Sequence, residues 1–286
     1  MSQALGVLAA LAAAVLYSIG VTLQSIEARN TPESESLRPS LIRDLLARKR
    51  WLIGTACVVG GWFMQAVALM NAPITVVQPA LAVSVVALLF IGARWFGERV
   101  RPKEILAALA ITIGVGGLVA ASPGHSDSHA APLTLALGMT VLGAIALAPF
   151  LLKGRKLGGM ISLGAGIAYA WTGFSTKFLA DSMADGSWVV ALLWLAATVG
   201  AAGVGLLSEM TALQSRSAIR VFPVVLVTQI VVAVLLAPLL AGESWSPDPL
   251  VIAGLGVSLA IVAAATRALA GATAVEAAIA TAAEPA

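Results

Sequence analysis

The chain has 286 residues, of which 59% are hydrophobic and 11% are charged, and its mean hydropathy is +0.97. A soluble globular protein carries roughly 25% charged residues, so this composition excludes a water-facing surface and indicates an integral membrane protein. The net charge of +3 is no sign of a nucleic-acid partner, because the placement of charges matters more than their sum in such a protein. The single cysteine, Cys57, excludes an intrachain disulfide.

Nine stretches are predicted to cross the bilayer, whose hydrocarbon core needs about 20 mostly apolar residues per helix. The first has no Lys or Arg before it, so we expect a retained span instead of a signal peptide. The predicted spans are 4–24, 51–70, 73–94, 104–121, 132–152, 158–180, 188–209, 218–240 and 249–268. The Ala-rich tail from Leu269 is predicted to be a frayed cytoplasmic end.

The basic residues predict the orientation of these spans. Residues 25–50 carry ten charges and therefore form a loop. The odd-numbered loops, the span ends beside them and the tail together hold 16 of the 17 Lys and Arg residues, and the even-numbered loops hold none. The positive-inside rule then places the N-terminus outside the inner (cell) membrane and the C-terminus in the cytoplasm. Lys177, inside the sixth span, is the exception.

A long stretch of the chain occurs twice. Gly61, Ala68-Leu69 and Pro79 recur 144 positions later as Gly205, Ala212-Leu213 and Pro223. Gly97-Glu98 and Pro102 recur 145 positions later as Gly242-Glu243 and Pro247. Tyr17 and Tyr169 occupy matching positions in the first and sixth spans, 152 residues apart. Two long apolar copies are typical of a transporter built from internal repeats.

The matching spans run in opposite directions through the predicted topology. We therefore expect an all-α polytopic protein of four spans, one linking span and four inverted spans. The units are residues 1–121, with a cytoplasmic loop at 25–50; an outer loop and linking span at 122–157; a second repeat at 158–268; and a tail at 269–286. Inverted repeats place a binding site near the midplane between the halves, and their rocking gives alternating access.

A proline lies inside a span in each copy. Pro79 and Pro223 cannot donate to the carbonyl four residues back, so each frees a backbone oxygen, those of Thr75 and Ile219. In lipid such an oxygen is tolerated only against protein or a wet cavity. One interpretation is a kinked, cavity-lining helix in each half, and the other is a structural kink alone. The side chains expected to line the cavity are those of Thr75, Gln78 and Gln229.

Two of the charged side chains inside the predicted spans, Glu209 and Lys177, are candidates for function. Glu209 corresponds to Gln65 in the first copy, and a buried charge costs about 2.5–3.5 kcal/mol on insertion scales. Glu209 either couples transport to a proton or cation, or forms an interfacial pair with Arg216. Lys177 either pairs with Asp181 one turn on or faces an anionic substrate. The candidate solute- or ion-binding residues are therefore Tyr17, Gln65, Thr75, Gln78, Pro79, Tyr169, Lys177, Glu209, Pro223 and Gln229.

No catalytic residue, metal site or cofactor is predicted. Both histidines, His125 and His129, lie in one outer loop with Asp127, and a flexible polar turn is favoured there over a metal site. The chain contains neither a G-x-x-x-x-G-K-[ST] run nor an H-E-x-x-H motif, so we expect a gradient-driven carrier and not an ATPase or a metalloprotease.

The chain resembles the drug/metabolite transporter superfamily (EamA-like proteins), and within it the NIPA-type magnesium transporters. The resemblance is carried by Gly61, Ala72-Pro73, Thr75, Pro79 and Gly97-Glu98, and in the second half by Lys177, Ala212-Leu213, Val221 and Pro223. It implies a polytopic carrier and, through the NIPA-type proteins, transport of Mg²⁺. The sequence departs from that family at Trp62, where those proteins tend to have an acid, and at Gly205, Leu207 and Met210.

The expected function is secondary transport of a small solute or ion. An NIPA-like carrier of Mg²⁺ or another divalent cation is the alternative, and a non-transporting membrane subunit is a more remote one. The expected partners are the solute or ion and membrane lipid, without nucleic acid, and a homodimer is left open.

Overall fold

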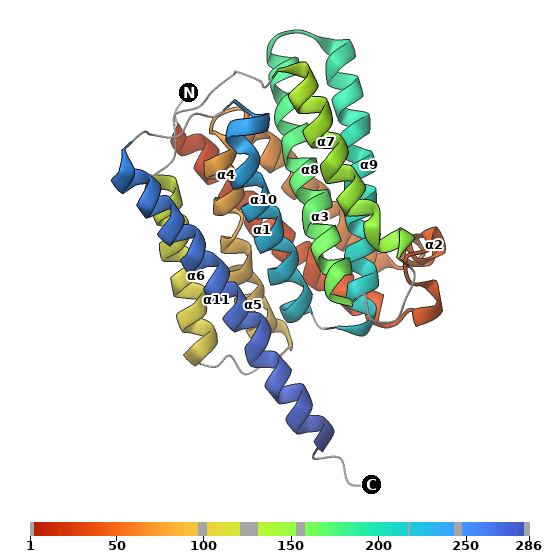
Figure 1. The fold of residues 1–286 in the computed structure, drawn as a ribbon. Helices are drawn as coiled ribbons and strands as arrows, with labels where there is room; N and C mark the ends of the chain where they lie inside the picture. The colour runs from red at the N-terminus through yellow and green to blue at the C-terminus, as the bar shows by residue number, and fades with distance from the viewer. Residues whose placement is uncertain are drawn as a thin grey trace.

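The computed structural model describes residues 3–96, 102–120, 131–152, 158–216, 218–242 and 248–282, and over these residues the regular structure is entirely helical. The helices are α1 (Gln3–Arg29), α2 (Pro39–Leu46), α3 (Lys49–Leu69), α4 (Ile74–Ala80), α5 (Val83–Phe96), α6 (Pro102–Ala120), α7 (Pro132–Leu151), α8 (Gly158–Ala184), α9 (Trp188–Ser215), α10 (Ala218–Leu240) and α11 (Pro249–Ala282), with a 3₁₀ turn η1 at Glu33–Glu35. The long helices form a single bundle (Figure 1).

Six of the described helices are long and apolar enough to cross a membrane, judged by length and composition. They fall within α1, α3, α7, α9, α10 and α11, and they make this a multi-pass membrane protein. Shorter apolar runs, Val76–Leu88 and Ile105–Gly114, lie in α4–α5 and α6. All nine predicted spans coincide with helical segments, and only the third is broken.

Helix α8 has the length of a span but not the composition. Its 27 residues include several glycines, serines and threonines together with Lys177 and Asp181. Almost every side chain from Ala165 to Ser182 is buried or half-buried, because α8 is surrounded by α3, α4, α7, α9 and α10. A helix enclosed by protein needs no apolar face toward lipid, so a low hydropathy does not exclude α8 as a membrane span.

Small residues bring the helices into close contact. α1 crosses α3 where Gly20 faces Gly54, and a Cβ added to Gly20 would come within 2.7 Å of the Gly54 carbonyl oxygen. Close backbone approach at small residues is a common basis of helix association in membranes.

The third predicted span is discontinuous. α4 ends at Ala80, the turn Leu81-Ala82 follows, and α5 begins at Val83. The break follows Pro79 by two residues, whereas the helical bond that this proline cannot make is the one to the Thr75 carbonyl in the turn before it. In the second half α10 continues as helix through both Pro223 and Pro238, so the two copies of the repeat differ here, and the kink predicted at Pro223 stays a prediction.

The loop after α1 packs on the protein. Leu41 and Leu45 of α2 are fully buried in a cluster with Trp51 of α3 and Met210 and Leu213 of α9. Its leucine face is thus covered by the chain itself and not by lipid.

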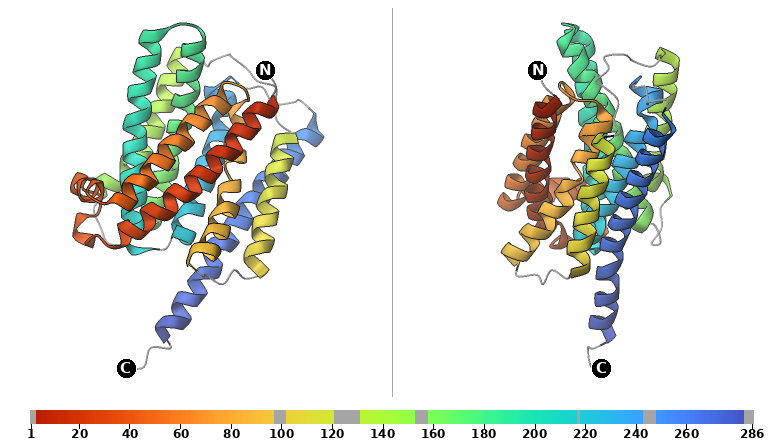
Figure 2. Two further views of the ribbon diagram at one scale, coloured as in Figure 1. Left: turned by 180° about the vertical axis from the view of Figure 1, so that it is seen from behind. Right: turned by 90° about the vertical axis from the view of Figure 1, so that its left-hand side faces the viewer.

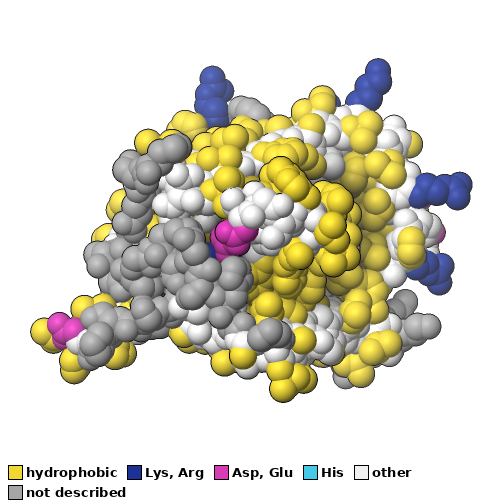
Figure 3. All heavy atoms as spheres, turned by 90° about the horizontal axis from the view of Figure 1, so that it is seen from above, with side chains coloured by type: hydrophobic (Ala, Val, Ile, Leu, Met, Phe, Trp, Pro, Cys, Tyr) yellow, Lys and Arg dark blue, Asp and Glu magenta, His cyan; other side chains and the backbone are white. Residues whose placement is uncertain are grey.

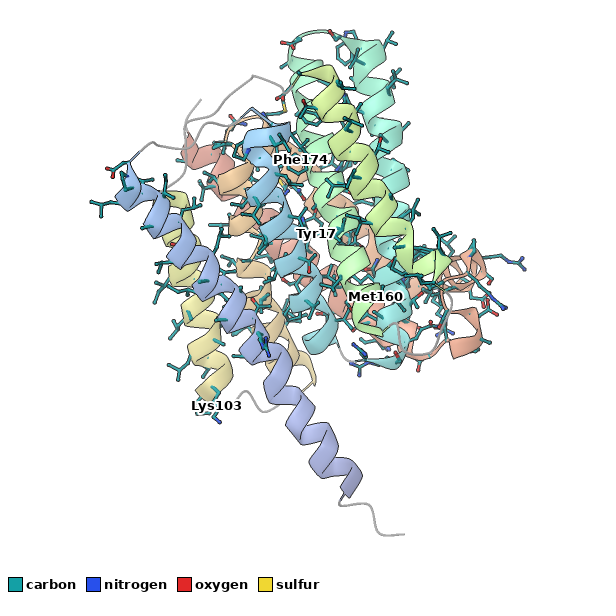
Figure 4. All side chains as sticks on the ribbon, viewed as in Figure 1. Tyr17, Lys103, Met160 and Phe174 are labelled. Carbon is teal, nitrogen blue, oxygen red and sulfur yellow. The ribbon has the colours of Figure 1, made fainter. Side chains whose placement is uncertain are left out.

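The chain ends lie at opposite ends of the bundle. α1 begins at one end, and α11 finishes at the other and extends past its neighbours (Figures 1 and 2). Lys103 marks the second end, called here the basic end (Figure 4). α11 continues to Ala282, beyond the predicted end at residue 268, because its Ala-rich sequence favours helix.

Candidate functional site

A tyrosine–amide pair joins α1 to α3 near the middle of the bundle. The Tyr17 hydroxyl donates a hydrogen bond of 2.7 Å to Oε1 of Gln65, which is buried. Figure 4 places Tyr17 at mid-height, well away from Lys103. Both residues belong to the predicted site, and the structure brings them into direct contact.

A tyrosine–carboxyl pair joins α8 to α9. The Tyr169 hydroxyl donates a hydrogen bond of 2.7 Å to Oε2 of Glu209, which is 3% exposed. The other carboxyl oxygen, Oε1, is buried without a hydrogen-bond partner among the described residues. Arg216 is exposed and forms no pair with Glu209, so the predicted interfacial pair is wrong. α9 continues six residues beyond Glu209, which puts it about 9 Å inside the helix end.

A glycine accommodates the tyrosine ring in each pair. A Cβ on Gly61 would lie 3.0 Å from the Tyr17 ring, and a Cβ on Gly205 would lie 2.7 Å from that of Tyr169. Gly61 and Gly205 are the residues that open the two copies of the repeat. The helices that carry the two pairs adjoin one another, since α1 contacts α9 and α3 contacts α8.

Two further predicted residues meet between α4 and α10. Gln229 Nε2 donates to Gln78 Oε1 at 2.9 Å, and Gln78 is fully buried. Gln78 Nε2 packs against Gly173 so closely that a Cβ added to this glycine would clash with it. The same nitrogen has no hydrogen-bond partner in the described part of the chain. Pro223 is buried within α10.

Several predictions fall outside the described part of the structure. The side chains of Thr75 and Pro79, the Gly97-Glu98 motif, its counterpart from Glu243 to Pro247, and the loop with His125 and His129 all lie there.

Lys177 and Asp181 form the ion pair expected from their spacing. Their Nζ and Oδ2 atoms are 3.2 Å apart, and the side chains are 0% and 7% exposed. The neighbouring Thr176 accepts a hydrogen bond of 2.9 Å from the Trp62 indole, which links α8 to α3. Viewed end-on, the face opposite the basic end is mostly hydrophobic, with acidic side chains near its centre (Figure 3).

A hollow of about 500 Å³ lies between α7, α8 and α9, and its walls are largely small and apolar. It contains none of the predicted site residues. The polar pairs instead lie in the contacts between the helices that carry them.

Sequence reasoning missed some polar groups in this interior. Ser18 Oγ donates to the backbone oxygen of Ser84 at 2.7 Å, beside the α4–α5 break, and Ser84 Oγ and Ser208 Oγ are buried without partners among the described residues. Serines are common in membrane helices and carry no distinctive spacing. Only their proximity to the proline and to Glu209 could have drawn attention to them.

Among the described residues, no three His, Cys, Asp or Glu side chains gather as a metal site would require. The interior offers a buried carboxyl, two phenols and three amides, a set able to bind and release a proton and to hydrogen-bond a small solute.

The comparisons with known proteins give one relative of similar length. A protein of Corynebacterium glutamicum is 27% identical over 276 residues, covering 94% of this chain and 95% of that protein. It is described only as an uncharacterized protein, so its name carries no function. No protein-family model matches the chain, and no solved structure matches it.

Proposed function

We propose that this chain is a secondary transporter that moves a small solute or ion across the membrane by alternating access. The observation that carries the proposal is the matched pair of buried contacts, Tyr17–Gln65 and Tyr169–Glu209, each with its glycine. A membrane subunit without transport activity has no need of two such polar sites in its interior, because buried polar groups in membrane helices are costly.

The helix contacts support two inverted units of four spans with α7 between them. α1 packs against α3 and α5, and α8 packs against α9 and α10 in the same order. α6 and α11 pack against each other across the two units. α1 starts at the end where α8 finishes, since Met160 lies below Phe174 in Figure 4. We expect two units in this relation to share a site near the midplane, at the level of Tyr17.

The broken helix α4–α5 also supports transport. Discontinuous helices supply free backbone groups at the binding sites of many secondary transporters. Here the break is flanked by Gln78 and Ser84, both buried and each with a polar atom that lacks a partner among the described residues. These groups are suited to contact the solute.

Glu209 is proposed to couple transport to a proton. Its counterpart Gln65 makes the same contact with a tyrosine but cannot ionise. Of the two matched pairs, only that of Glu209 can therefore bind and release a proton. A proton on Glu209 removes a charge whose burial in the membrane is costly, and protonation would therefore alter the balance between the two access states.

The test starts from detergent-purified protein and a thermal-shift screen of cations and metabolites, because a ligand stabilises the state that it binds. A stabilising compound is then offered to proteoliposomes that contain a trapped pH dye. We expect solute-dependent proton movement, absent from empty vesicles. Solute uptake with no accompanying proton movement would remove the coupling role.

Magnesium transport is the second candidate, because the sequence resembles NIPA-type proteins. Proteoliposomes loaded with a magnesium-sensitive dye test it directly. Mg²⁺ entry above that of empty vesicles would make the ion the substrate, and no entry would remove this candidate.

A further inference from the structure

The loop between α1 and α3 is fastened to the second half of the chain. The Leu37 backbone N–H donates to Thr211 Oγ1 at 2.9 Å, and Ser36 Oγ donates to Gln214 Oε1 at 2.9 Å. Gln214 Nε2 returns a bond of 2.8 Å to the Pro32 carbonyl and one of 3.2 Å to Thr31 Oγ1. We call this set of bonds the clasp. It joins residues 31–37 to the last two turns of α9.

An apolar layer lies beside the clasp. Leu41 and Leu45 of α2 pack with Met210 and Leu213 of α9, and Tyr169 packs against the same cluster. Met210 and Thr211 directly follow Glu209 in α9. From the basic end inward, the chain therefore presents the clasp, the leucine layer and then the Tyr169–Glu209 pair.

The backbone at the centre of the clasp is strained. Leu37 has a φ of +56°, and no other non-glycine residue in the described ranges has a positive φ. A branched side chain is disfavoured in this left-handed region, so the conformation persists only while neighbouring contacts impose it. Two clasp bonds, those of Leu37 N–H and Ser36 Oγ, supply the constraint.

The other end of the loop is anchored to the first half. Arg48 pairs with Glu27 at 3.1 Å and donates to the Asn30 carbonyl at 3.1 Å. The loop thus has a fixed end on α1 and α3 and a fastened end on α9.

We propose that residues 30–47 form a lid that closes the path from the basic end to Glu209 and opens when the clasp breaks. This inference rests on the proposed function, since it describes one gate of the alternating-access cycle. Releasing the clasp frees α2 to lift its two leucines from α9 and relieves the strain at Leu37. Glu209 then becomes accessible from the basic end.

The test measures access next to Glu209 without any substrate. Cys57→Ser provides a cysteine-free background, because Cys57 is the only cysteine. Ser208→Cys then adds a buried reporter beside Glu209, and its reaction rate with a charged methanethiosulfonate reagent is followed in inside-out vesicles. Gln214→Ala removes three of the four clasp bonds, and we expect it to raise this rate by at least about tenfold, the factor that corresponds to one typical net hydrogen bond. Thr211→Val, which removes only the acceptor of the Leu37 N–H, is the milder second variant.

A cross-link tests the closed state. Ser36→Cys with Gln214→Cys should be joined by a short bifunctional thiol cross-linker, which spans the length that the glutamine side chain occupies, and should protect the reporter, whereas the matched pair Ser36→Cys with the exposed Ser215→Cys should cross-link more slowly. A reporter rate that neither the clasp variants nor the cross-link changes would overturn the lid. A responsive reporter in a protein that moves no solute would leave the lid in place and remove the transporter.

Discussion

Glu209 is the residue on which the proposed proton coupling depends. Glu209→Gln keeps the oxygen that accepts from Tyr169 but cannot ionise, and it reproduces the amide already present at Gln65. We expect this variant to fold and to lose solute uptake driven by a pH gradient, while exchange of solute without a gradient continues. The measurement is uptake into proteoliposomes with and without an imposed gradient. Unchanged gradient-driven uptake would make Glu209 structural.

Replacing each tyrosine by phenylalanine removes the hydrogen-bond donor of a different buried group. Tyr169→Phe strands a buried carboxyl, and Tyr17→Phe strands a buried neutral amide. A hydrogen bond to a charged group is worth about 1.5–3 kcal/mol and a neutral one about 0.5–1.5 kcal/mol. Tyr169→Phe should therefore lower the thermal unfolding temperature in detergent by more than Tyr17→Phe does. Equal shifts would mean that Glu209 is uncharged in the resting protein.

The glycines beside the tyrosine rings can be tested with neighbours as controls. Gly205→Ala places a Cβ 2.7 Å from the Tyr169 ring, whereas Gly203→Ala in the same helix meets nothing within 4 Å. Overpacking of this kind costs about 1–3 kcal/mol, and an alanine in open space within a helix gains about 0.5–1 kcal/mol. The two variants should shift the unfolding temperature in opposite directions. A neutral Gly205→Ala would show that the ring moves freely.

The buried ion pair in α8 should behave as a unit. Lys177→Met leaves Asp181 charged and 7% exposed, and loss of one partner from a buried pair costs about 3–5 kcal/mol. The double variant Lys177→Met with Asp181→Leu removes both charges and should recover much of that loss. Thermal unfolding of the two single variants and the double variant gives the coupling. Strictly additive losses would place each charge in a separate interaction.

The residues of the site were predictable individually, but their pairing was not. The repeat aligns Gly61 with Gly205 and Tyr17 with Tyr169, which marks each position as distinctive. Which side chain faces which depends on how α1 crosses α3 and how α8 crosses α9, and an apolar sequence does not specify that crossing. For the same reason Glu209 was given Arg216 as one candidate partner, although Tyr169 lies against it.

At the scale of the elements, composition predicts where the helices lie better than it predicts which helices pack together. The predicted spans coincide with helical segments because a run of about 20 apolar residues has few other ways to satisfy its backbone in lipid. The break at Leu81-Ala82 was expected only as a kink, since a proline predicts a weakened turn and not its outcome. The burial of α2 against α9 joins residues over 160 positions apart, and no local pattern encodes such a contact.

The strained element of the lid offers a direct test. Leu37→Gly relieves a left-handed conformation that costs an ordinary residue about 1–2 kcal/mol. The glycine should stabilise the closed lid and slow modification of the Ser208→Cys reporter, provided that the clasp bonds stay intact. Leu37→Ala keeps the backbone strain while shortening the side chain, and it is the matched control. Faster labelling in Leu37→Gly would show that its side chain, and not the backbone, holds the lid.

At the scale of the whole molecule, the number of crossings determines where the chain ends lie. Six crossings, the number of described helices that meet the length and composition criteria, would return both termini to one face. Nine crossings, counting α8, α6 and the broken α4–α5 helix, put them on opposite faces. The bundle favours the second arrangement, because α1 begins at one end and α11 finishes at the other (Figure 2).

A fusion experiment distinguishes these counts. Green fluorescent protein at the C-terminus should fluoresce, as it does only in the cytoplasm, and a peptide tag at the N-terminus should bind antibody on spheroplasts with an intact inner membrane. The physical reason is that 16 of the 17 basic residues lie in loops, span ends and a tail that the nine-span topology puts on one side, where the positive-inside rule retains them. Tags found on the same face would require an even number of crossings. An even number of crossings would mean that the two units holding the polar pairs are not inverted. The chain would then lack the mirror-related openings on which alternating access depends.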